Sequence, residues 1–196
     1  RKRLLSDLET MALSNIIGFD DAPFDKTSDA PVTVVGAVFA GTRMHGVMSF
    51  EVARDGSDSA EAVIEAIRSS RFVEHLQLVM LQGIAFGGFN VVDVFEVHET
   101  LRLPVMVVSR KEPDREAIRR VLLERIPEGG AKWSVLERLG EMESVRGVWI
   151  QRVGLDLDEA EEALGASVVE GYLPEPLRVA HMIAGGIVRG ESGGRP

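Results

Sequence analysis

Cysteine is absent from the 196 residues of this chain. Its absence excludes a disulfide framework, a zinc site built on cysteine, an iron–sulfur cluster and a thiol nucleophile. The fold must therefore depend on a hydrophobic core, and the composition allows one because 45% of the residues are hydrophobic and 27% are charged. The length predicts one compact domain over residues 1–196.

Long apolar runs are lacking as well. No stretch reaches the ~18 to 20 residues needed to cross a bilayer, and the opening segment RKRLLSDLE has no apolar stretch of the kind that secretory signals carry. We therefore expect a cytoplasmic protein without a membrane partner.

Positive charge is scarce, with 22 Lys and Arg against 31 Asp and Glu and a net charge of −9. Because phosphate binding draws on clustered basic residues, this balance excludes a protein that coats nucleic acid with its whole surface. A local cleft for DNA or RNA stays compatible with it. The oligomeric state is left open by the sequence.

The first third of the chain predicts three strands. Runs rich in β-branched and aromatic residues extend from Ser14 to Phe19, from Val32 to Phe39 and from His45 to Val52. Only a hairpin fits the short connection at Gly41-Thr42-Arg43, so the second and third strands must be antiparallel, and we expect the three runs to form an antiparallel meander.

The rest of the chain alternates between helix and strand periodicity, which is typical of an α/β protein with helices on the faces of a mixed sheet. Pro127 and Gly129-Gly130 are expected to close the helix predicted over 114–126. Predicted helices run over 57–69 (or 59–69), 91–101, 114–126, 156–164 and 176–188, and predicted strands over 76–81, 105–108 and 145–153.

Polar residues follow several of these strands, where functional groups commonly lie. Asp20 and Asp21 end the first run, Asp55 follows the third, and Gln82 ends the fourth. If strands one, three and four are sheet neighbours, their ends converge and the oxygen ligands suit Mg²⁺ or Mn²⁺. The alternative is that the aspartates are simply turn residues, a role in which aspartate is common.

The glycine-rich segment GIAFGGFN follows Gln82 and offers Gly83, Gly87 and Gly88 as backbone contacts for a phosphate. It matches neither GxGxxG nor the Walker motif, so a tight strand-to-helix connection is the alternative. Arg110 is predicted at the same edge of the sheet, either holding a phosphate or simply solvated at a helix start. His181 lies near an acidic segment and is either a catalytic residue or an ordinary helix residue.

Five segments together carry a family resemblance: GFDD, ARDG followed by a helix, LQGIAFGGFNVVD, PVMVVSRK and LPEPLRVAHMIA, in that order. On these segments the chain resembles the archaeal family of uncharacterised proteins called domain of unknown function 99, which is distantly similar to endonuclease V. The similarity covers most of the chain. It implies a ribonuclease H-like fold, with three antiparallel strands, then parallel strands, and helices on both faces.

The resemblance also implies a nuclease that uses Mg²⁺ or Mn²⁺. Asp20 stands where the first-strand aspartate binds metal, and Asp55 stands where endonuclease V has a glutamate. His181 stands where some endonucleases V carry a supporting histidine, and Arg110 where a lysine follows the equivalent strand. Gln82 departs from the pattern, because most relatives have an aspartate there. An amide oxygen can bind Mg²⁺ but brings no charge, so weaker metal binding is expected.

A second departure is the hairpin at Gly41-Thr42-Arg43, which lacks the aromatic and proline-rich wedge expected in endonuclease V, so specificity for inosine is not implied. Two hypotheses follow. The first is a metal-dependent phosphodiester hydrolase acting on DNA or RNA through Asp20, Asp55, Gln82 and His181. The second is a catalytically silent module, with no cofactor, that binds nucleic acid or protein. An enzyme acting on a phosphate ligand bound by the glycine-rich loop is a third, weaker alternative.

Overall fold

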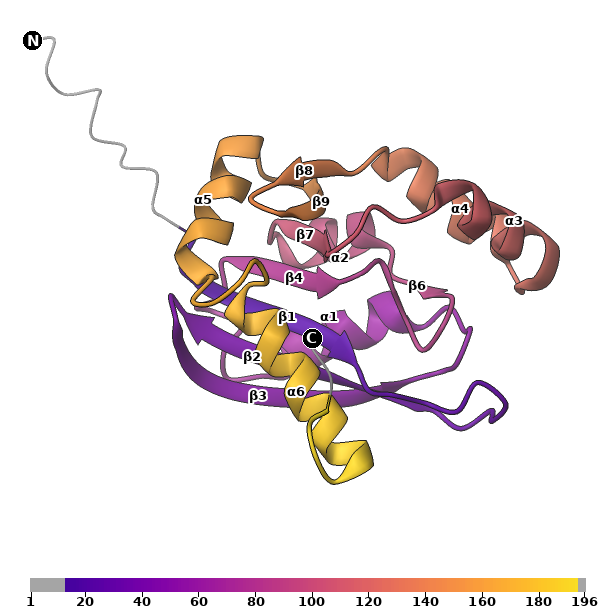
Figure 1. Cartoon of the computed structure of the whole chain (residues 1–196), viewed down its shortest axis with the longest axis horizontal. Coiled ribbons are helices and arrows are strands. Elements are labelled where there is room, and N and C mark those ends of the chain that lie inside the picture. Colours follow the sequence, from indigo (N-terminus) through magenta and orange to yellow (C-terminus); the bar gives the residue numbers. More distant parts are fainter. Residues whose placement is uncertain (1–12, 194–196) are drawn as a thin grey trace, which may run out of the picture.

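A seven-stranded mixed sheet forms the centre of the molecule, with strand order β3-β2-β1-β4-β7-β9-β8. The computed structural model describes residues 13–193, so the segment RKRLLSDLE lies outside the described part. Figure 1 shows the sheet with helix α6 crossing in front of it. The strands are β1 (Asn15–Asp21), β2 (Val32–Ala40), β3 (Arg43–Val52), β4 (Leu78–Gln82), β7 (Val105–Ser109), β8 (Glu143–Val145) and β9 (Val148–Val153).

The directions of the strands decide which ends meet. β1, β2 and β3 form an antiparallel meander, and β4 and β7 run parallel to β1. The predicted mixed α/β sheet is confirmed, although β9 returns antiparallel to β7. The premise that strands one and three are neighbours is wrong, because β2 lies between them. In a meander alternate strands share a direction, so β3 still ends at the same edge as β1 and β4.

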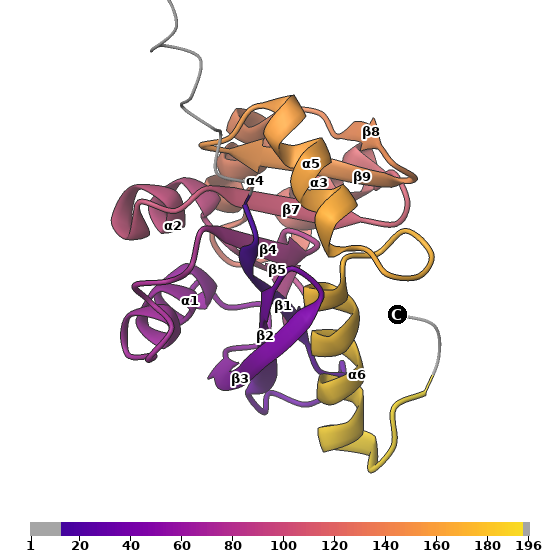
Figure 2. The same cartoon turned by 90° about the vertical axis from the view of Figure 1, so that its left-hand side faces the viewer.

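Helices cover both faces of the sheet, as predicted, and Figure 2 shows one pair on each side. Helices α1 (Ser59–Arg68) and α2 (Val94–Leu101) pack on one face, and α5 (Leu157–Ser167) and α6 (Glu175–Arg189) on the other. Strand residues alternate between the two faces: Ile17 and Phe19 belong to the first core, and Ile16 to the second. Within residues 13–193, no helix combines the length and apolar character needed to cross a bilayer.

The helix predicted over 91–101 begins at Val94 instead. The Asp93 side chain accepts hydrogen bonds from the backbone N–H groups of Phe95 and Glu96, which is the usual way of capping a helix start. Val91 pairs with Ala85 in a small hairpin formed by β5 (Ala85–Phe86) and β6 (Asn90–Val91). The glycine-rich segment is therefore mostly a hairpin.

The helix predicted over 114–126 does end before Pro127 and Gly129-Gly130, but a second helix, which the sequence did not predict, begins at these glycines. Helix α3 (Arg115–Arg125) is followed by α4 (Gly129–Leu139), which begins at the first of these glycines. A Cβ at Gly129 would collide with the carbonyl of Leu122. Glycine is thus present because α4 starts against the backbone of α3.

The strand predicted over 145–153 is in fact a hairpin of β8 and β9. Its turn is Arg146-Gly147, and both residues have positive φ, 50° and 86°. Two consecutive left-handed residues are the geometry of a type I′ hairpin turn. Arginine rarely adopts this conformation, and apolar residues surround it. The sequence therefore predicted one continuous strand and no turn.

Candidate active site

The candidate site lies where β1, β4 and β7 end. Phe19 of β1 pairs with Leu81 of β4, so the next residues, Asp20 and Gln82, are neighbours across the two strands. Side chains at paired positions of parallel strands point to the same face. That face is the one covered by α6, and the prediction that these two residues meet at one edge agrees with this register.

His181 reaches the site from α6, and its Nδ1 lies 2.7 Å from Oδ2 of Asp20. The approach depends on Gly18 in β1, where a Cβ would lie 2.6 Å from the carbonyl carbon of Pro176. Only glycine lets the helix rest this closely on the strand. Asp20 is 4% exposed, whereas the His181 side chain is 31% exposed. The histidine therefore connects a buried carboxylate to solvent.

The electrostatic environment of Asp20 has opposing components. Burial raises its pKa above the usual value, because a charged carboxylate loses its hydration. The hydrogen bond from His181, its charge when protonated, and the positive charge of Arg110 each lower the pKa. The net direction is upward. A further positive charge at this position would therefore stabilise the ionised carboxylate.

Gln82 presents an unusual acceptor. Its side-chain oxygen Oε1 is buried and has no hydrogen-bond partner among residues 13–193. A buried acceptor without a partner costs about 1–3 kcal/mol. The oxygen thus provides a coordination position for a cation or a donor, beside the buried carboxylate of Asp20.

Asp21, one residue later, alternates to the other face of β1. Its Oδ2 accepts a 2.7 Å hydrogen bond from the backbone N–H of Gly87. Burial raises the pKa of Asp21 to about 6, and the neighbouring charge of Asp20 also acts in this direction. The Gly87 hydrogen bond lowers the pKa but does not offset the burial.

Asp55 is connected to this edge of the sheet through the β5–β6 hairpin, which has Gly87 at its tip. Its backbone N–H donates to the Gly87 carbonyl at 2.9 Å. Its Oδ1 accepts from the Phe89 N–H at 2.9 Å, and its Oδ2 from Arg54 at 3.0 Å. Both carboxylate oxygens thus have protein donors. The structure links Asp55 to Asp21 through Gly87, whereas no hydrogen bond joins Asp55 to Asp20.

Lys132 of α4 contacts Asp55, and the sequence did not predict this contact. The residue is only 5% exposed, and its Nζ donates to the Asp55 carbonyl at 2.7 Å. Asp55 has a left-handed backbone, with φ of 52°, and the lysine stabilises the carbonyl of that strained residue. Lys132 escaped notice because it lies in the helix that was not predicted.

The three predicted glycines have different surroundings. The N–H of Gly83 donates to the Val108 carbonyl at 2.9 Å, and the N–H of Gly87 is used by Asp21. A Cβ on Gly88 would collide with the Asp55 carboxylate. Gly87 and Gly88 both have positive φ, 54° and 92°, as the tip of the hairpin requires. Two of the three amides are thus occupied by protein acceptors.

A cavity of about 260 Å³ adjoins the edge beyond Gln82. Its wall includes Gly83, Ile84, Gly88 and Phe89 from the glycine-rich segment. The opposite wall comes from α3, α4, the connection between α4 and β8, and β9, with Arg115, Leu136, Glu141, Met142 and Gln151 among its residues. Mostly apolar walls with a few polar groups are typical of pockets for small organic ligands.

The residues available as metal ligands limit how tightly a cation can be held. Within the described part of the chain, no three residues among histidine, cysteine, aspartate and glutamate are grouped so that they could hold a metal ion. Asp20 and the unpartnered oxygen of Gln82 are both oxygen donors, the type that Mg²⁺ and Mn²⁺ prefer. These residues fit a weakly held cation that keeps several waters, rather than a closed metal cage.

Comparisons with known proteins agree with this architecture. The chain matches the family model described as Endonuclease dU over residues 13–188. A UPF0215 protein of Deinococcus radiodurans is 50% identical over 93% of this chain and 93% of its own length. A UPF0215 protein of Methanothermobacter thermautotrophicus is 44% identical over 91% of this chain and 90% of that protein. The relatives thus include a bacterium besides archaea.

Solved structures give the same result. A protein of unknown function from Archaeoglobus fulgidus superimposes with a TM-score of 0.82 at 33% identity, over 89% of this chain and 98% of that one. The catalytic domain of human endonuclease V gives 0.55 at 15% identity, over 92% and 84%. Endonuclease V of Ciona intestinalis, solved with DNA containing an inosine, gives 0.54 at 12% identity, over 89% and 85%.

At such low identity the likeness to endonuclease V shows the fold alone, and it confirms the predicted ribonuclease H-like architecture. The resemblance inferred from the five sequence segments is confirmed by the family match. The chain belongs to the Endonuclease dU family.

Proposed function

We propose that this protein is an endonuclease that hydrolyses phosphodiester bonds of DNA or RNA with the help of Mg²⁺ or Mn²⁺. The observation that carries the proposal is the hydrogen bond between the buried Asp20 and the partly exposed His181, beside the unpartnered oxygen of Gln82. The family description supports it, since it names an endonuclease and dU. The endonuclease V of Ciona intestinalis, which shares the fold, was solved with inosine-containing DNA.

Asp20 and Gln82 would hold the cation, whereas Asp55, whose carboxylate oxygens both accept hydrogen bonds from the protein, is left out of this site. When bound, the cation supplies neutralisation of phosphate charge and a lowered pKa of water. The raised pKa of Asp20 fits this role, because a cation would offset the cost of burying the carboxylate.

His181 acts through its two ring nitrogens. When Asp20 is ionised, its carboxylate accepts the hydrogen bond from Nδ1, which fixes the ring and leaves Nε2 as the nitrogen that can exchange a proton with the substrate or with water. A positioned histidine of this kind contributes typically 10²–10⁴-fold to a rate. Its partial exposure allows a substrate to reach it.

Arg110 is the proposed phosphate contact. It follows β7 at the same edge, close enough for its charge to act on Asp20, and no ion pair is formed by its guanidinium with the residues of the described range. A guanidinium suits a phosphate because its donors match the oxygen geometry. Gly83 and Gly88, which line the adjoining cavity, leave room for a base turned out of its stack.

The volume of that cavity suits a single nucleobase rather than a stretch of polynucleotide. At about 260 Å³, it lies just below the ~300 Å³ at which pockets for small ligands begin. A nuclease that acts at a particular base must extrude that base into a pocket of matching shape. The cavity therefore supports a base-dependent activity.

A second candidate function is a catalytically silent module that binds nucleic acid or protein. The neutral amide of Gln82 favours it, because it offers no charge to hold a divalent ion. The two functions differ in metal binding. Under the silent alternative Mn²⁺ does not bind measurably, whereas the endonuclease binds it through Asp20.

The deciding experiment is cleavage of single-stranded and duplex DNA and RNA, with and without deoxyuridine or inosine, in Mg²⁺ or Mn²⁺. We expect the wild type to cleave at least one of these substrates and Asp20→Asn to lose the activity. Gln82→Asp should cleave faster, because it adds a second charged ligand. Absence of cleavage by both the wild type and Gln82→Asp would reject the proposal.

A further inference from the structure

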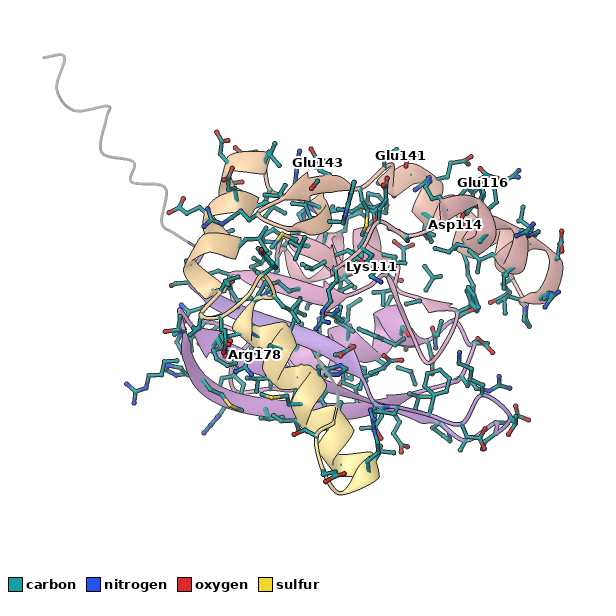
Figure 3. All side chains as sticks on the ribbon, viewed as in Figure 1. Lys111, Asp114, Glu116, Glu141, Glu143 and Arg178 are labelled. Atoms are coloured by element: carbon teal, nitrogen blue, oxygen red, sulfur yellow. The ribbon has the colours of Figure 1, made fainter. Side chains whose placement is uncertain are left out.

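A second concave surface lies beside the candidate site, on the side covered by α5 and α6. It is a groove of about 560 Å³, and its lining includes Arg110, Gly147, Glu170, Tyr172 and Arg178. Figure 3 shows Arg178 on α6, in the same view as Lys111 on the segment after β7. The residues come from the end of β7, the β8–β9 turn, the connection before α6 and α6 itself.

Tyr172 is the dominant feature of this groove. It is the chain's single tyrosine, and it is 67% exposed, so a large aromatic surface is available to a ligand in the groove. A Cβ on Gly147 would collide with the Tyr172 ring, so the ring lies directly against the turn between β8 and β9. The backbone supports the ring, and much of its surface is left to solvent.

Two residues of the groove also lie close to the candidate site. Arg110 lines the groove and its charge also acts on Asp20. Arg178 lies three residues before His181 on α6, which is about one helical turn. A nucleotide in the groove would therefore lie near the Asp20–His181 pair.

The charges of the groove favour one phosphate rather than many. Arg178 is neutralised by Glu175, with hydrogen bonds of 2.6 and 2.7 Å, and Glu170 adds a negative charge to the wall. Arg110 makes no ion pair with any residue between 13 and 193. Duplex binding relies on many phosphate contacts, whereas a single strand can bind by stacking a base on an aromatic ring.

We propose that this groove binds an unpaired nucleotide of a single-stranded segment next to the scissile phosphate, with its base stacked on Tyr172 and its phosphate on Arg110. The inference rests on the proposed nuclease function and names the substrate class as nucleic acid that is single-stranded beside the cleavage point.

The test measures binding of a fluorescein-labelled oligothymidylate to the full chain by fluorescence anisotropy, in EDTA so that no cleavage occurs. The same measurement with oligouridylate and with a duplex separates DNA from RNA and single from double strands. Replacing Tyr172 by Ala should weaken single-strand binding about tenfold or more, since stacking on one aromatic residue contributes this much. Tyr172→Phe should stay within about twofold of the wild type, because the ring is kept.

Val169→Ala is the matched control. Val169 lies in the same connection and is 64% exposed, but it is not part of the groove wall. Its replacement should leave binding unchanged. Both positions are exposed, so neither variant threatens folding. A second readout uses 5-iodouracil in the oligonucleotide: light should cross-link it to Tyr172, which mass spectrometry identifies as the crosslinked residue.

The outcomes separate the two proposals. If the wild type binds single strands and Tyr172→Ala binds equally well, the groove inference is overturned while the nuclease proposal stands. If the wild type binds neither DNA nor RNA in any form, the nuclease proposal fails and the groove inference fails with it. Tyrosine-dependent binding with a crosslink at Tyr172 would establish the groove.

Discussion

Replacing Gln82 by Asp places a second carboxylate beside Asp20, and its effect can be worked out from the register of β1 and β4. Neighbouring strands lie ~5 Å apart. At that distance two unit charges repel by ~3 kcal/mol with an effective dielectric constant of 20. Without a divalent ion, Gln82→Asp should therefore lower the free energy of unfolding by up to about 3 kcal/mol at neutral pH, less whatever a raised carboxyl pKa relieves.

A divalent ion reverses this penalty, because it is attracted by both charges. We expect Mn²⁺ to bind Gln82→Asp at least about tenfold more tightly than the wild type, which corresponds to 1.4 kcal/mol or more. Mn²⁺ should also restore the lost stability by mass action. Urea unfolding in EDTA and in Mn²⁺ measures the stabilities, and calorimetric titration measures the affinities.

The double variant Asp20→Asn, Gln82→Asp is the control. It carries one carboxylate at this place, as the wild type does, so the repulsion and the stability loss in EDTA should both disappear. Equal Mn²⁺ affinity of the wild type and Gln82→Asp would refute the reasoning, because it would mean that residue 82 does not face the same ion as Asp20.

Three further predictions concern neighbouring residues. His181→Ala should lower the cleavage rate by about 10²–10⁴-fold while oligonucleotide binding by anisotropy stays unchanged; a loss of binding instead would make His181 a substrate contact. Asp21 has a pKa raised from 3.8 to about 6, so folding is favoured by its protonation and that contribution is lost as pH rises through 6. Asp21→Asn should then exceed the wild type in unfolding free energy by up to about 3 kcal/mol at pH 7.5 and match it near pH 4; a pH-independent difference in urea unfolding would contradict this. Gly18→Ala should cost about 1–3 kcal/mol of stability and lower the cleavage rate, because its Cβ would push Pro176 and α6 away; a variant with wild-type melting and activity would show that α6 can shift freely.

The sheet could be predicted because its strands are short apolar runs rich in β-branched residues, and β1 and β4 are buried along almost their whole length because helices cover both faces of the sheet. The short turn at Gly41-Thr42-Arg43 also determined the direction of β3 relative to β2. The helix α4 could not be predicted, because glycine usually ends a helix. At Gly129 the residue serves a close contact with Leu122, which only the tertiary structure reveals.

The candidate site was predicted in part for the same reason. Asp20 and Gln82 end strands that are neighbours, so their meeting follows from the order of the sheet. The contact of His181 with Asp20 spans 161 residues and depends on the close approach of α6 at Gly18. The hydrogen bonds that Asp55 accepts from Arg54 and Phe89 could not be predicted, because the sequence does not show how the tip of the β5–β6 hairpin packs against the segment after β3.

The most direct test of the central claim is a crystal of the wild-type protein soaked in Mn²⁺ and measured for anomalous scattering. The account predicts a peak within coordination distance, about 2–2.5 Å, of both a carboxylate oxygen of Asp20 and the side-chain oxygen of Gln82. No peak at the end of β1, or a peak bound by other residues, would contradict it.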